Sequence, residues 1–95
     1  MIKHVVMFKL KDRSKESIQQ AAEKIRGMKG KIPELEDLEV GTDFMKSDRS
    51  FDLVLTAVLK SKQDLESYAK HPAHQPVLEY LKDAADQVIA VDYEK

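Results

Sequence analysis

Cysteine and tryptophan are absent from this 95-residue chain, and glycine and proline occur only three times each. The lack of cysteine excludes a disulfide scaffold and a thiolate-held zinc or iron–sulfur site. No apolar run reaches the roughly 18 residues that a membrane-spanning helix needs. A lysine interrupts the apolar N-terminal stretch and no small-residue cleavage site follows it, so no signal peptide is expected. The sequence therefore predicts a soluble, cytoplasmic protein with no membrane partner.

The residues that are present suit one small globular core. Hydrophobic residues make up 42% of the chain and charged residues 35%, which excludes a disordered segment. A chain of this length has room for a single domain, here residues 1–95.

Charge is divided unevenly, although the net charge is only −1. Residues 1–31 carry nine lysines and arginines and three acids, and the remainder of the chain is acidic. The bases interleave with apolar positions, and no arginine–aromatic pattern accompanies them. We therefore expect a solvated basic face and no nucleic-acid partner.

Two periodicities alternate along the chain. Residues 2–11 have a period of two and are rich in β-branched side chains, which predicts a strand. From Ser14, an expected N-cap, the apolar residues follow helical spacing until the stop signals Gly30 and Pro33. The same reasoning predicts a strand at 38–45, a loop at 46–50, a strand at 51–60, helices within 61–85 that break at Pro72, and a strand at 88–93.

The resulting order, β-α-β-β-α-α-β, is typical of an α+β, ferredoxin-like fold with a four-stranded antiparallel sheet. Helices cover only one face of such a sheet. Six aliphatic residues would then share the uncovered face: Val5, Met7, Val54, Val58, Ile89 and Val91. Because a monomer rarely exposes such a patch, we expect a homodimer that packs through the helix-free sheet face.

The sequence contains no phosphate-binding, dinucleotide-binding, nucleophile-elbow or zinc-protease motif. No HxH or ExxH spacing, which would set two metal ligands on one face, occurs, so we expect neither a metal nor a cofactor. The remaining candidates for chemistry are the three histidines and a tyrosine that precedes two of them in the stretch YAKHPAH.

His4 is the single polar residue on an otherwise apolar strand face, where it could end a ligand pocket or be a core histidine with one hydrogen bond. His74 falls at the start of the last helix, where the helix dipole favours the neutral imidazole that a general base requires. The break at Pro72 could bring Tyr68 to His74, although Tyr68 could equally be an ordinary core residue. His71 fits a structural role in the kink, and we expect it to point elsewhere.

A pocket between the sheet and the helices would need an apolar wall for a small hydrophobic or aromatic ligand. We expect this wall to consist of Val6, Phe8, Leu55, Ala57, Leu65 and Leu78.

Three segments together, IKHVVMFKLK, YAKHPAHQPV and DYE, resemble the stress-responsive A/B barrel (Dabb) family over essentially the whole chain. The resemblance implies a dimeric α/β barrel with a pocket between sheet and helices. Plant polyketide cyclases of this family use a strand histidine, a tyrosine and the second histidine of HPAH. The resemblance therefore implies catalytic roles for His4, Tyr68 and His74. Those cyclases carry bulky aromatics on the first helix, where this chain has Ala21, Ala22 and Ile25.

Two functions remain open from the sequence. The first is a stress-associated or ligand-binding homodimer with no assigned reaction. The alternative is a cofactor-free cyclase or lyase that acts on an enolisable, polyketide-like or aromatic compound. In that case His74 would be the base, Tyr68 the donor to the enolate, and His4 the orienting group.

Overall fold

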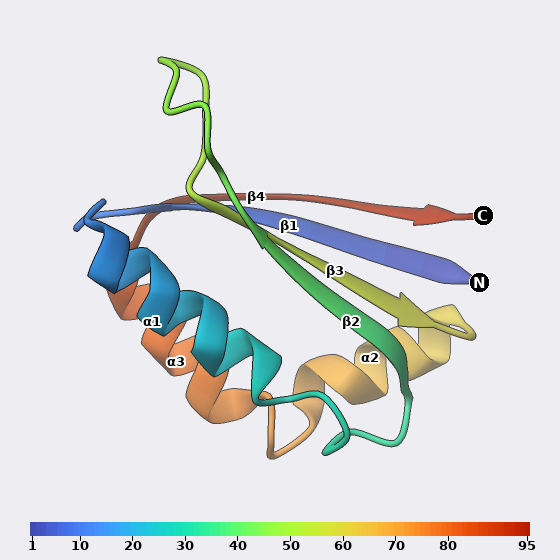
Figure 1. The fold of residues 1–95 in the computed structure, drawn as a ribbon. Helices are drawn as coiled ribbons and strands as arrows, with labels where there is room; N and C mark the ends of the chain where they lie inside the picture. The colour runs from blue at the N-terminus through green and yellow to red at the C-terminus, as the bar shows by residue number, and fades with distance from the viewer.

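A computed structural model of residues 1–95 shows one antiparallel sheet with all its helices on one face (Figure 1). The strands lie in the order β2-β3-β1-β4, which confirms the predicted ferredoxin-like α+β fold. The strands are β1 (Ile2–Leu10), β2 (Leu35–Thr42), β3 (Leu53–Leu59) and β4 (Ala85–Glu94). The helices are α1 (Lys15–Arg26), α2 (Lys62–Lys70) and α3 (Gln75–Ala84). None of these helices has the length and apolar character needed to cross a membrane.

Serine side chains cap the N-termini of two of the helices. Ser14 caps α1, because its hydroxyl accepts a hydrogen bond from the Ser17 backbone N–H, as the sequence predicts. The hydroxyl of Ser61 caps α2 in the same way. Helix α1 ends at Arg26, earlier than the predicted stop at Gly30. Gly30 instead lies in the following turn with a φ of 83°, a conformation that glycine adopts without strain.

Three predicted strand boundaries are wrong by three residues each, and β3 begins two residues later than predicted. Strand β2 begins at Leu35 and ends at Thr42, so Phe44 lies in the β2–β3 loop with 87% of its surface exposed. The reason is pairing: β3 begins at Leu53 opposite Thr42, and no ladder partner remains for later residues. Strand β4 begins at Ala85, inside the predicted helical range, because it pairs there with Leu10.

The hydrophobic core lies between the sheet and the helices. Alternate residues of β1 and β3 face the helices, and α1 packs on them through its apolar stripe, which includes Ala21 and Ile25. Strand β4 is an edge strand, and the side chains of its central residues are exposed. No residue of β4 therefore belongs to the buried core, and the candidate site lies beside this strand.

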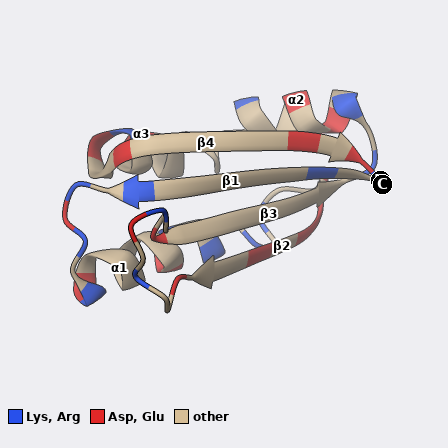
Figure 2. Ribbon diagram, turned by 90° about the horizontal axis from the view of Figure 1, so that it is seen from above, with Lys and Arg blue, Asp and Glu red and all other residues tan.

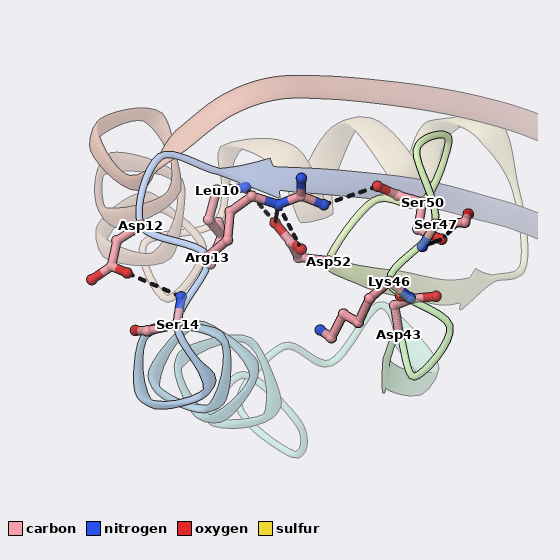
Figure 3. A network of polar contacts seen from close by, with 9 residues as sticks. All are labelled: Leu10, Asp12, Arg13, Ser14, Asp43, Lys46, Ser47, Ser50 and Asp52. Carbon is pink, nitrogen blue, oxygen red and sulfur yellow. Dashed lines mark hydrogen bonds and ion pairs between the residues drawn. The ribbon is translucent and has the colours of Figure 1, made fainter.

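One buried carboxylate ties the first loop to the sheet (Figure 3). Asp52 is only 1% exposed and accepts hydrogen bonds from the Leu10 backbone N–H at 2.8 Å and from the Arg13 Nε at 3.1 Å. Arg13 also donates from Nη2 to the Ser50 carbonyl at 3.0 Å. These contacts fasten the end of β1, the approach to α1 and the start of β3 to one another.

The helix-free face of the sheet, which faces the viewer in Figure 2, carries exposed apolar side chains. The strand register places Val5 beside Val91, and Met7 beside both Val54 and Ile89, as the alternation predicts. Met7, Ile89 and Val91 are 39%, 50% and 61% exposed. The middle of β1, β3 and β4 is free of charged residues in this view. Together with Val58, these residues form the sheet patch.

Candidate functional site

A cavity of about 510 Å³ lies between the sheet and helices α2 and α3. Its volume is within the range that small-molecule sites usually have. His4, Tyr68 and His74 all line it, and most of the remaining wall is apolar. Five of the six expected wall residues are present: Val6, Phe8, Leu55, Leu65 and Leu78. Ala57 does not line the cavity, because its side chain is fully buried in the core opposite Leu38 of β2.

Three elements bring the polar side chains together. His4 belongs to the helix-facing row of β1, between the buried residues Ile2 and Val6. Tyr68 lies in the last turn of α2. The chain then turns at Pro72, so that His74 becomes the N-cap residue of α3 and faces back toward Tyr68. The ring centre of Tyr68 is 4.7 Å from that of His74 and 6.0 Å from that of His4.

The hydrogen bond that His74 makes fixes its tautomer. Its Nδ1 lies 3.0 Å from the Ala69 carbonyl oxygen, which can only accept, so Nδ1 carries the proton. The Nε2 of a neutral His74 is then left with a free lone pair. Burial lowers the pKa of His74, and the nearby His4 lowers it further, whereas the bond to Ala69 acts in the opposite direction. His74 is therefore a neutral proton acceptor at neutral pH.

Tyr68 supplies a donor that the protein leaves unused. Its residue surface is 1% exposed, and its buried hydroxyl makes no hydrogen bond within the protein. Buried polar groups without a partner are uncommon and costly. Burial also raises the pKa of Tyr68 to about 12, so the hydroxyl keeps its proton. A carbonyl or enolate oxygen in the cavity would satisfy this donor.

Asp92 is a partner of His4 that sequence reasoning missed. The two residues are directly opposite in the β1–β4 pairing, and the Nδ1 of His4 contacts the Asp92 carboxylate. An ionised carboxylate only accepts, so it holds the proton of His4 on Nδ1 and fixes the ring orientation. The sequence does contain a signal for this contact, namely an acid in the last strand. An antiparallel pairing of β1 and β4 in the observed register places that acid opposite His4. Asp92 therefore positions His4.

His71 lies apart from this group, as expected. Its Nδ1 accepts a hydrogen bond from the Ala73 backbone N–H at 3.0 Å, and the side chain does not line the cavity. His71 thus stabilises the turn between α2 and α3. No group of three or more histidine, aspartate or glutamate side chains is arranged to hold a metal ion.

The sequence and the fold both match a known family. Residues 2–95 match Dabb, the Stress responsive A/B Barrel Domain. The chain belongs to this family. An uncharacterized protein of Streptomyces coelicolor is 31% identical over 97 residues, and the match covers 99% of each chain.

Solved structures share the fold of this Dabb chain. A dimeric protein of unknown function with a ferredoxin-like fold, from Bacteroides fragilis, superposes with a TM-score of 0.85 at 27% identity, covering 99% of this chain and 95% of that one. A hydroxynitrile lyase from Passiflora edulis superposes with a TM-score of 0.82 at 20% identity, covering 97% and 90%. At 20% identity, the similarity to the lyase shows that the two proteins share a fold and does not show that they share an activity.

Proposed function

We propose that this Dabb protein is a homodimer that binds a small hydrophobic carbonyl compound in the cavity between sheet and helices. The observation that carries the proposal is the buried, unpartnered hydroxyl of Tyr68 beside an apolar cavity. Ligand sites commonly combine apolar walls with a few polar groups that fix the ligand's orientation. A carbonyl oxygen accepts from Tyr68, and the ligand body packs on the wall near Phe8 and Leu55.

The arrangement of His74 favours a second, catalytic candidate function on the same ligand. The Nε2 of neutral His74 takes a proton from the carbon next to the carbonyl group. The C–H electron pair becomes a C=C bond, and the carbonyl π pair moves to the oxygen. Tyr68 stabilises the resulting enolate by donating a hydrogen bond to that oxygen. The enolate can then attack a second carbonyl, as in a cyclisation, or expel a leaving group, as in a lyase reaction.

Within the Dabb family, the chain resembles the plant olivetolic acid cyclase. This resemblance supports the proposed chemistry but does not identify the substrate. His4, Tyr68 and His74 match the residues that the cyclase uses. Ala21, Ala22 and other α1 residues are buried against the sheet and do not line the cavity. The wall that the cyclase builds from aromatics on its first helix is therefore different here. The lyase from Passiflora edulis similarly offers an analogy of fold and nothing more.

Deuterium exchange tests the proposed function directly. Wild-type protein is incubated with phenylacetone in deuterated buffer, and NMR follows both ligand binding and loss of the α-proton signal. Binding with exchange above the protein-free rate supports both candidate functions. Binding without exchange supports a ligand-binding protein and contradicts the catalytic one. Absence of binding across a panel of aryl ketones and β-keto acids contradicts both.

The pH dependence of exchange follows from the state of His74. The acceptor is the neutral ring, so the rate rises with pH through the pKa of His74 and is constant above it. Burial places this pKa below its ordinary value of 6.5, so the rate passes its half-maximum below that pH and is close to its plateau above pH 7. Tyr68, with a pKa of about 12, causes no decline at neutral pH. A protein-dependent rate that still rises severalfold between about pH 7 and 8 would contradict His74 as the base.

We also propose that the second protomer covers the sheet patch. The dimeric relative from Bacteroides fragilis has the same fold, and the exposed aliphatic side chains here need a cover. A further hollow of about 620 Å³ beside the β2–β3 loop includes Met7 and Val54, so it borders the same surface. We assign this hollow to the dimer contact rather than to the ligand, because it contains no histidine or tyrosine.

A charge in the sheet patch is expected to separate the protomers. Val54→Asp places a carboxylate within the proposed interface, where desolvation opposes its burial. Sedimentation equilibrium at micromolar concentration should show a dimer for the wild type and for the isosteric Val54→Thr, and a monomer for Val54→Asp. A monomeric wild type, or a Val54→Asp protein that remains dimeric, would contradict the proposed interface.

A further inference from the structure

The cavity has different charges near its two ends. Lys82 is the only lysine, arginine or acid that lines it, and it projects from α3 eight residues after His74. Eight residues of helix span about 12 Å. Along β1, His4 and Phe8 are four residues apart, or about 13 Å. Both elements therefore indicate an elongated cavity, with the His4–Tyr68–His74 group at one end and Lys82 at the other.

The end at Lys82 is open to solvent. Tyr68 is almost fully buried, whereas Lys82 is exposed and Val88, which also lines the cavity, is 52% exposed. A ligand that enters past Lys82 with its hydrophobic end first brings a carbonyl group on that end to Tyr68. Its trailing polar group then remains near the Lys82 ammonium.

Lys82 has no partner of its own. The ion pairs of the structure join His4 to Asp92, Arg13 to Asp52, Lys29 to Asp37, and Lys60 to Glu36. No acid of α3 or β4 holds the Lys82 ammonium, so it is free to meet an anion. At the opposite end the Asp92 carboxylate contacts His4 and would repel an anionic group placed there.

We infer that the ligand is an elongated amphipathic carboxylic acid, oriented with its carbonyl group at Tyr68 and its carboxylate at Lys82. This inference rests on the proposed function and adds the ligand class and its direction in the cavity. The alternative role of Lys82 is structural, because a cation in the last turn of a helix complements the helix dipole. The two roles predict different behaviour of Lys82 variants.

Calorimetric binding of ω-benzoylheptanoate and of its primary amide tests the inference. The two probes have the same aryl ketone and chain and differ only in the terminal charge. We expect wild type to bind the carboxylate about fivefold more tightly than the amide, which is the size of a partly exposed ion pair. The preference should shrink as salt rises. Lys82→Gln should bind the two equally, and Lys82→Glu should prefer the amide. Lys62→Gln, on α2 and away from the cavity, should behave as wild type.

The outcomes separate the inference from the proposed function. If wild type binds both probes equally, or if Lys82→Gln keeps the preference, the orientation is overturned while the cavity remains a ligand site. A loss of stability in Lys82→Gln with an unchanged preference assigns the lysine to the helix dipole and also overturns it. If wild type binds neither probe and no ketone from the earlier panel, the proposed function itself fails.

Discussion

Replacing His74 with glutamine is expected to slow the protein-dependent exchange of phenylacetone α-protons by about 10²–10⁴-fold. Glutamine can still donate a hydrogen bond to the Ala69 carbonyl, which His74 meets through Nδ1. It cannot accept a proton, however, so the chemical step loses its base. Ketone binding should change little, because the apolar wall and Tyr68 remain.

His71→Gln is the matched control, because His71 belongs to the same turn and does not line the cavity. It should exchange at the wild-type rate. Tyr68→Phe should bind the ketone more weakly and also exchange slowly, since the hydroxyl contacts both the carbonyl and the enolate oxygen. Equal loss in His71→Gln and His74→Gln would mean that the turn, and not the base, is responsible.

Replacing Asp52 with alanine is expected to lower the free energy of unfolding by about 3 kcal/mol. The change leaves the buried Leu10 N–H without an acceptor and removes the only carboxylate that Arg13 contacts. The strands β1 and β3 would lose their shared anchor at one end. Since small domains are stable by about 5–15 kcal/mol, this is a large fraction of the total.

Chemical denaturation at a fixed protein concentration measures this effect. Asp48→Ala is the control, because Asp48 lies exposed in the β2–β3 loop and makes no hydrogen bond or ion pair. Its midpoint should match that of the wild type. If Asp52→Ala unfolds at the same denaturant concentration as Asp48→Ala, the buried ion pair contributes nothing to stability.

Local signals were sufficient to predict the fold. The period-two alternation of β1, the cap at Ser14 and the break at Pro72 depend on neighbouring residues, and the structure contains all of them. Boundaries set by pairing were harder to predict. Phe44 continues the alternation of β2, yet the ladder ends at Thr42 because β3 supplies no further partner.

Contacts between residues distant in sequence account for what the sequence analysis missed. Asp92 meets His4 across 88 positions, and Asp52 meets Arg13 across 39, so neither pair follows from periodicity. Lys82 appears as an ordinary helix-surface lysine until the cavity beside it is known. The grouping of His4, Tyr68 and His74 was suggested by the helix break, but their catalytic roles stay a prediction.

A crystal structure of the protein with bound phenylacetone tests the central claim most directly. The account predicts the ketone in the cavity between the sheet and α3, with its carbonyl oxygen about 2.7 Å from the Tyr68 hydroxyl and its α-carbon facing the Nε2 of His74. A ketone found only in the hollow beside the β2–β3 loop would contradict the account. So would a cavity that closes around Leu78 and excludes the ketone at saturating concentration.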